Sequence, residues 1–209
     1  MKILNEYQSK QLLKKYDIPI PRGAIVKNKD EARNVAASIG TGSVMKLVSS
    51  DVVHKSDGGF VVLNVDYREA EKVYDVMIEK ANKIGAKITG VLVEEMLSGY
   101  ELIIGLKKDI QFGQIIMVGM GGIYAEVYKD VSFRVAPITF YDAHKMLEEL
   151  KGYKILTGIR GKEKADLSKV AEIIVKVSNL KNIIELDINP LICNSSTAIA
   201  ADVRVIIEE

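Results

Sequence analysis

Short runs rich in β-branched residues recur along the chain, and amphipathic segments with helix-capping residues separate them. Runs of this kind predict strands at residues 23–27, 43–48, 60–65, 88–95, 100–107, 114–119, about 182–188 and 197–207. Capping residues followed by apolar faces of period 3.6 predict helices over 6–16 and after Asn28, Asp66, Thr139 and Asp166. Because both kinds of element carry an apolar face, the pattern predicts an α/β fold in which helices cover sheets.

The charge and composition of the chain exclude several classes of partner. Its 209 residues carry 29 Lys+Arg and 28 Asp+Glu, and no basic block marks a nucleic-acid binder. The apolar run from Ile103 to Leu106 is far shorter than the roughly 20 residues of a membrane span. The N-terminus turns polar after two apolar residues, and the single Cys193 has no second cysteine to pair with. We therefore expect a cytoplasmic protein with no nucleic-acid or membrane partner.

Three strand-like runs follow one another over 88–95, 100–107 and 114–119, and a larger sheet is expected to begin near residue 97. We expect two lobes, residues 22–96 and 97–209, with the helix within 1–21 packing on the second lobe. No repeat or flexible linker separates them, so the lobes are expected to share a cleft, which is a common place for a ligand.

The loop VVHKSDGG holds the first of two histidines, His54, followed by Lys55, Gly58 and Gly59. A neutral imidazole can attack phosphorus, while a lysine and glycine amides stabilise the charge of a phosphoryl group. The alternative is an ordinary histidine in a polar turn. The other histidine, His144, lies on a predicted amphipathic helix and is expected to be a solvated residue.

Lys46 lies inside the apolar run VMKLV, so its charge requires a compensating anion or partner. A nucleotide phosphate would serve, and the alternative is a lysine that extends to solvent from a half-exposed strand. Glu94 and Glu95 end one predicted strand, and Glu101 begins the next. These carboxylates gather where the two lobes meet, or they are solvated charges of a hairpin.

Oxygen-bearing side chains concentrate near the C-terminus, in ELDINPL and AADVRV. These segments place Glu185, Asp187, Asn189 and Asp202 on neighbouring strands that end at one edge. Such ligands suit Mg²⁺, which binds one or two protein groups together with phosphate oxygens. Zinc is disfavoured because Cys193 has no companion thiol.

A glycine cluster at Gly119, Gly121 and Gly122 matches neither the P-loop pattern nor the dinucleotide-binding pattern. It is interpreted as a tight turn or an anion-binding nest, with Arg134 as a bidentate phosphate partner. The alternative is a bulged strand in which Arg134 pairs with Asp130.

Taken in order, these motifs resemble one family, the ATP-grasp (β) subunits of ADP-forming acetyl-CoA synthetases, which are related to succinyl-CoA synthetase β subunits. The resemblance covers essentially the whole chain. It rests on LNEYQSKQLLKKYDIPIP, VMKLVSSDVVHKSDGG, VEEM, GGIYAEVYKDVSFRVAPIT and ELDINPL. HKSD followed by GG, together with KDVSFRVAPIT, is more specific than ELDINPL, which related ligases share.

The resemblance implies an ATP-grasp fold of two α+β lobes, with the nucleotide in the cleft between them. It assigns the nucleotide phosphates to Lys46, adenine to the backbone of Glu94, Glu95 and Met96, and the ribose to Glu101. Asn189 and Asp202 match positions that hold Mg²⁺, and Asp187 is a weaker candidate. His54 matches a histidine that is transiently phosphorylated.

The implied function is that of the nucleotide-binding subunit of an ADP-forming acyl-CoA synthetase. A CoA-binding α subunit, in an α2β2 assembly, would make acyl phosphate, and His54 would relay the phosphoryl group to Mg-ADP to give ATP. One alternative is an ATP-grasp ligase that activates a carboxylate directly. Another is a nucleotide-binding regulatory module without catalysis.

Overall fold

The structure is a computed structural model that describes residues 1–49, 58–122, 130–159, 161 and 163–208. The chain divides into two compact units. Unit 1 comprises Met1–Ile20 and Ser98–Glu209, and unit 2 comprises Pro21–Leu97. Each junction falls one residue from the boundary expected from the sequence. Among the described helices, none is long and apolar enough to cross a membrane.

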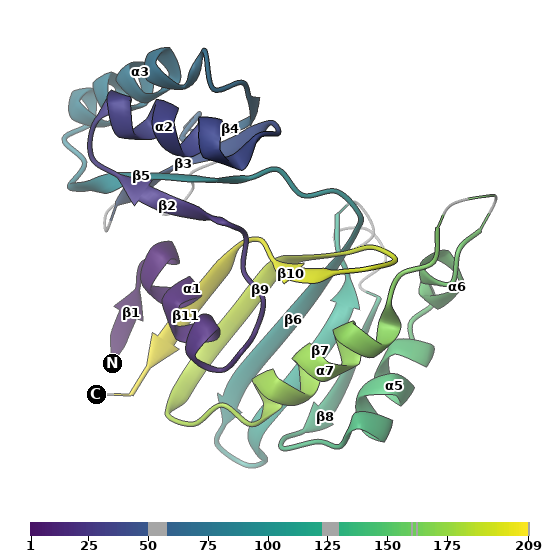
Figure 1. Ribbon diagram of the computed structural model, residues 1–209. Helices are drawn as coiled ribbons and strands as arrows, with labels where there is room; N and C mark the ends of the chain where they lie inside the picture. The colour runs from purple at the N-terminus through teal and green to yellow at the C-terminus, as the bar shows by residue number, and fades with distance from the viewer. Residues whose placement is uncertain (50–57, 123–129, 160, 162, 209) are drawn as a thin grey trace. The chain divides into compact units, whose positions relative to one another are not determined.

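Unit 2 is built on an antiparallel four-stranded sheet in the order β2-β5-β3-β4 (Figure 1). Its strands are β2 (Gly23–Val26), β3 (Ser43–Ser49), β4 (Val61–Val65) and β5 (Ile88–Glu95). Helices α2 (Lys29–Ile39) and α3 (Ala70–Lys83) pack against each other and contribute Ala32, Ala36 and Met77 to the core. All seven residues of β3 are buried, and β3 is one of the two inner strands of this sheet.

Unit 1 contains a seven-stranded sheet in the order β1-β11-β9-β6-β7-β8, with β10 paired to β9. Its strands are β1 (Lys2–Leu4), β6 (Tyr100–Asp109), β7 (Gly113–Met120), β8 (Val131–Val135), β9 (Ile183–Cys193), β10 (Ala198–Ala200) and β11 (Val203–Ile207). Its helices are α1 (Glu6–Lys15), α5 (Phe140–Glu148), α6 (Tyr153–Leu156) and α7 (Leu167–Ser178). Because β1 pairs with β11, the N-terminal segment belongs to this unit.

The two faces of the large sheet differ in burial. Helices α5 and α7 lie across one face (Figure 1), where Leu102, Ile104, Ile116 and Ile188 are buried. The residues between them along each strand project to the other face, because strand side chains alternate. We call the first the helix face and the second the open face. The open face includes the exposed residues Lys107 and Phe133.

Local capping explains where the helices begin. The Asn5 side chain accepts a hydrogen bond from the Gln8 N–H at 2.9 Å, and the Gln8 side chain accepts one from the Asn5 N–H at 3.1 Å. These bonds confirm the predicted capping box. Thr139 and Asp142 form a second capping box at the start of α5. Asn28 and Asp166 cap α2 and α7, as predicted.

Some predicted elements differ from those in the structure. The Asp66–Glu69 capping box is wrong, because the Asp66 carboxylate accepts the N–H of Arg68 in a turn and α3 begins later, at Ala70. Ile84, at the C-terminal end of that helix, is exposed. The strand predicted over 100–107 extends further, because β6 continues to Asp109. The sequence did not indicate β1, β8 or α6.

We predict that Asn5→Ala lowers the free energy of unfolding by about 1 kcal/mol, because α1 loses a side-chain cap. Asn82→Ala is the matched control, since Asn82 is exposed in the last turn of α3. There alanine raises helix propensity, so stability should stay equal or rise slightly. Urea unfolding of both variants measures the difference, and equal losses would contradict the capping role.

Candidate functional site

Lys46 is buried in unit 2, and its charge is compensated within that unit. Its side-chain ammonium lies 3.6 Å from the Oε2 atom of Glu94, and the two residues are only 8% and 3% exposed. Lys46 faces Leu92 across β3 and β5, so Glu94, two residues further along β5, is its diagonal neighbour on the same face. The predicted need for a partner is confirmed. A lysine extending to solvent is ruled out, as is a solvated Glu94.

The end of β5 is held by β2 and by the residue that precedes β2. Gly23 lies opposite Glu94, and a Cβ atom at Gly23 would approach Val93 O to 2.2 Å and Glu94 Cγ to 3.0 Å. Glycine is therefore required for β2 to lie so close to this glutamate. The neighbouring Glu95 accepts the N–H of Arg22 at 2.9 Å and its Nε at 2.6 Å.

Two backbone donors in the predicted adenine-reading segment already have acceptors. Glu95 N–H donates to Arg22 O at 2.9 Å, and Met96 N–H donates to Gly42 O at 3.1 Å. The Met96 side chain is 40% exposed. A base that used either N–H group would have to compete with these carbonyl oxygens.

The predicted phosphohistidine loop is only partly within the described residues. His54 and Lys55 lie outside them, whereas Gly58 and Gly59 form the turn that leads into β4. Gly59 has a φ of +68°, and a Cβ atom there would lie 2.9 Å from the Lys80 ammonium. The positive φ favours glycine at this position, whereas the flexible Lys80 side chain could move away from a Cβ atom.

The predicted oxygen ligands come together on the open face of unit 1. Asp187 and Asn189 flank the fully buried Ile188 on β9, so their side chains project away from the helix face. Asp202 directly precedes β11, and its carbonyl oxygen accepts the Asn189 N–H at 3.1 Å. The structure therefore brings together side chains that lie up to 15 residues apart in sequence.

Negative charge is concentrated at this cluster. Burial raises the pKa of the Asp187 carboxyl, the charges of Asp202 and Glu185 add to the increase, and Arg204 opposes it. A cation would relieve the repulsion among these carboxylates. Two carboxylates and an amide oxygen are ligands that fit a hard cation such as Mg²⁺.

Glu101 is the second residue of β6 and lies beside the glycine cluster. Its carbonyl oxygen accepts the Gly121 N–H at 2.7 Å, and a Cβ atom at Gly121 would lie 2.9 Å from three Glu101 atoms. Gly122 has a φ of +62°, and a Cβ atom there would lie 3.1 Å from Glu101 Oε2. The glycines thus leave room for the exposed Glu101 side chain at the edge of the described segment.

Arg134 lies on a different face from the oxygen ligands. It is paired in register with the buried Ile116, on the helix face, and its guanidinium forms an ion pair with Glu149 at the end of α5. Hydrogen bonds from Arg134 and then Ser132 hold the pKa of the Glu149 carboxyl below its usual value. The expected alternative pairing with Asp130 is wrong, since Asp130 accepts the N–H groups of Lys151 and Gly152.

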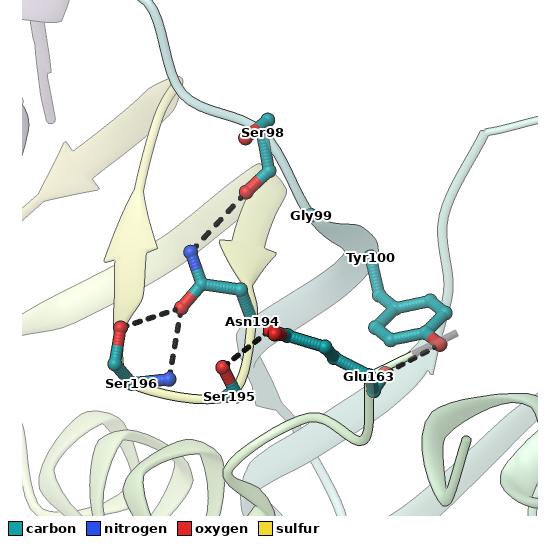
Figure 2. A pocket seen from close by; sticks show the side chains of 7 residues that line it. All are labelled: Ser98, Gly99, Tyr100, Glu163, Asn194, Ser195 and Ser196. Atoms are coloured by element: carbon teal, nitrogen blue, oxygen red, sulfur yellow. Dashed lines mark hydrogen bonds between the residues drawn. The ribbon is translucent and has the colours of Figure 1, made fainter. Parts of the chain in front are cut away.

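A polar pocket of about 440 Å³ in unit 1 was not indicated by the sequence (Figure 2). Asn194 donates to Ser98 O at 3.3 Å and accepts the N–H and hydroxyl of Ser196. Ser195 donates to Glu163 at 2.6 Å. These bonds join the segment that enters β6 to the turn after β9. The pocket is therefore best explained as a hydrogen-bonded cluster that positions the start of β6. We call the bonds among Ser98, Glu163 and residues 194–196 the clasp.

The clasp also requires close contact between two backbones. A Cβ atom at Gly99 would lie 2.3 Å from the carbonyl oxygen of Cys193. The Cys193 side chain is buried, and burial raises the pKa of its thiol to about 12. A thiol with so high a pKa is not a nucleophile at neutral pH.

Comparison with known proteins finds a family match over almost the whole chain. The model of the ATP-grasp domain family matches residues 1–207. The ADP-forming acetate–CoA ligase I subunit beta of Pyrococcus furiosus is 42% identical over 98% of this chain and 91% of its own length. The ADP-forming acetate–CoA ligase I of Archaeoglobus fulgidus is 45% identical over 95% of this chain, which spans only 30% of that relative.

Solved structures of the acetyl-coenzyme A synthetase 1 of Ca. Korarchaeum cryptofilum are also similar. One, in complex with coenzyme A, Ca-AMPCP and HgCl⁺, has a TM-score of 0.93 at 40% identity, covering 99% of this chain and 94% of that chain. Another holds coenzyme A and Mg-AMPPCP, with a phosphohistidine segment pointing towards the nucleotide-binding site. It has a TM-score of 0.86 at 37% identity, covering 99% of this chain and 93% of that chain.

We predict that Glu94→Gln lowers the free energy of unfolding by about 3 kcal/mol, because the buried ammonium of Lys46 loses its counter-charge. Glu95→Gln is the matched control. Its partner Arg22 is 69% exposed, so the loss should stay below about 1 kcal/mol. Denaturant unfolding measures both variants. A double-mutant cycle with Lys46→Met isolates the pair, and a coupling near zero would contradict the interaction.

Proposed function

Because this chain belongs to the ATP-grasp family, and within it to the β subunits of ADP-forming acetate–CoA ligases, we propose that it binds Mg²⁺ with ADP or ATP and transfers a phosphoryl group through His54. The observation that carries the proposal is the gathering of Asp187, Asn189 and Asp202 on the open face of unit 1. The Korarchaeum complex with Mg-AMPPCP and a phosphohistidine segment supports the same chemistry.

Asn189 and Asp202 would hold the magnesium ion, with Asp187 as a further carboxylate beside them. The ion, when bound, would neutralise the charge of the nucleotide phosphates. The residues of the chain orient the reactants around it. The hydrogen bond from Asn189 N–H to Asp202 O fixes the distance between β9 and the residue that precedes β11. Such preorganisation matters because phosphoryl transfer depends mainly on positioning and electrostatics.

In unit 2, Lys46 would contact the nucleotide phosphates, with Lys55, Gly58 and Gly59 contributing from the histidine loop. An anionic phosphate would then share the ammonium with Glu94, which now compensates its charge. The segment from Glu94 to Met96 would read adenine and Glu101 would bind the ribose. The phosphate role of Arg134 stays a prediction, in competition with its Glu149 ion pair.

The proposed chemical step conserves atoms and charge. A lone pair on a neutral imidazole nitrogen of His54 forms a bond to the γ-phosphorus of ATP. The bond between that phosphorus and the bridging oxygen breaks, and its electron pair leaves with ADP. The reverse step transfers the phosphoryl group from His54 to ADP. A neutral imidazole is required, because a protonated ring has no free lone pair on either nitrogen.

We propose that a separate CoA-binding α subunit supplies or accepts the phosphoryl group as acyl phosphate. The Pyrococcus relative is named a beta subunit, which supports a partner of this kind. An α2β2 assembly and a cytoplasmic location are part of the same proposal. The α subunit would select the acid, because the contacts with the acyl group are expected there.

Incubation with Mg-ATP, followed by intact-mass measurement, tests the proposed nucleophile. We predict one acid-labile, base-stable phosphate per chain for the wild type and none for His54→Ala, because only the imidazole forms a phosphoramidate. His144→Ala is the matched control and should be labelled like the wild type. If the wild type is unlabelled alone, the same measurement is made with the α subunit present.

Two results would overturn parts of this proposal. Acyl-phosphate formation that survives His54→Ala would indicate a ligase that activates the carboxylate directly. Tight Mg-ATP binding without any phosphorylation, even with the α subunit, would indicate a regulatory nucleotide-binding module. Absence of nucleotide binding to the wild type would reject all three functions.

A further inference from the structure

A phosphate site on the open face calls for a cation on that face, and the arginine singled out by the sequence is not there. Arg134 projects to the helix face. There its guanidinium forms an ion pair with Glu149, which also accepts a hydrogen bond from Ser132. Guanidinium groups are well suited to phosphate because they donate two parallel hydrogen bonds. We therefore looked for a second arginine on the strands that carry the oxygen ligands.

Arg204 occupies that position. Its neighbours on β11, Val203 and Val205, are 2% and 0% exposed on the helix face, so Arg204 projects to the open face. Its backbone is paired in register with Asp187, and its side chain is exposed. Directly opposed residues have Cβ atoms about 4.5–5.5 Å apart. The arginine is thus a cross-strand neighbour of the oxygen cluster and lies two residues after Asp202.

We propose that Arg204 is a phosphate-binding residue, whose guanidinium contacts the β- or γ-phosphate oxygens of the nucleotide held at Asn189 and Asp202. This inference rests on the proposed function. A nucleotide polyphosphate brings more negative charge than one divalent cation neutralises, so an adjacent guanidinium stabilises the bound state. The exposure of Arg204 leaves its donors accessible to such a ligand.

A purely structural role would make Arg204 a counter-ion of Asp187. The two roles predict different changes in binding affinity for ligands that carry phosphate groups and for ligands that carry none. A phosphate contact favours AMPPCP over adenosine and acts with or without magnesium. A counter-ion that only shapes the metal site changes AMPPCP affinity through magnesium alone.

Isothermal titration calorimetry of the full chain with AMPPCP, ADP and adenosine tests the proposal. We expect Arg204→Met to weaken AMPPCP binding by about 10- to 100-fold, in Mg²⁺ and in EDTA alike, with adenosine affinity unchanged. Arg204→Lys retains the charge but loses the paired donors, so its affinity for AMPPCP should lie between those of the wild type and Arg204→Met. The melting temperature of each variant without ligand verifies that it is folded.

Lys107→Met is the matched control for charge. Lys107 is an exposed cation on the same face, and its Nζ lies 3.8 Å from Glu185 Oε2. Its loss should change AMPPCP affinity less than about 5-fold. Arg134→Met is the competing variant and should weaken AMPPCP less than Arg204→Met does.

Three results would overturn the inference: equal loss of adenosine and AMPPCP affinity, a loss that disappears in EDTA, or a larger loss in Arg134→Met. An unchanged Arg204→Met variant beside a wild type that binds AMPPCP would reject this inference alone. A wild type that binds no nucleotide would reject the proposed function as well.

Discussion

The large sheet of unit 1 buries one face against helices, and the placement of its polar residues follows from that constraint. Leu102, Ile104 and Ile188 occupy the helix face, so the residues between them must project to the open face. This alternation puts Asp187, Asn189 and Arg204 in a common environment without any helix or loop to position them. A site built on strands is held more rigidly than one built on loops.

In unit 2 the comparable constraint is electrostatic. The inner strand β3 is buried along its whole length, and Lys46 lies within it. Two buried charges are costly to desolvate unless they lie close together, and Glu94 lies 3.6 Å away. This arrangement requires glycine at position 23, because a side chain there would collide with β5, the strand that carries Glu94.

Strand β8 shows why alternation alone does not assign a face. Its apolar residues Val131, Phe133 and Val135 are 40%, 56% and 56% exposed, while Ser132 and Arg134 project towards the helices. The rule that apolar side chains face the core would give the opposite orientation. The reason lies in α5, since Glu149 there accepts hydrogen bonds from Ser132 and Arg134. Arg134, which the sequence had suggested as a phosphate partner, therefore lies on the helix face and pairs with Glu149.

The sequence by itself determined the elements whose signals are local. Asn5 with Gln8, and Thr139 with Asp142, specify helix starts through bonds that span three residues. Runs of β-branched residues located most strands, and the motifs around Lys46 and Asn189 indicated the family. Short elements such as β1 and α6 gave no such signal, because they depend on pairing and packing rather than on propensity.

Only the tertiary structure decided which charged side chains meet. The partners of Lys46 and Arg134 come from other strands and helices, and no spacing in the sequence identifies them. The same is true of Asp187 and Arg204, which lie 17 residues apart and face each other through the register of β9 and β11. Register and sheet face are set by the burial of all the strands together. A local pattern can therefore propose a charged residue for a site, but packing determines whether it lies there.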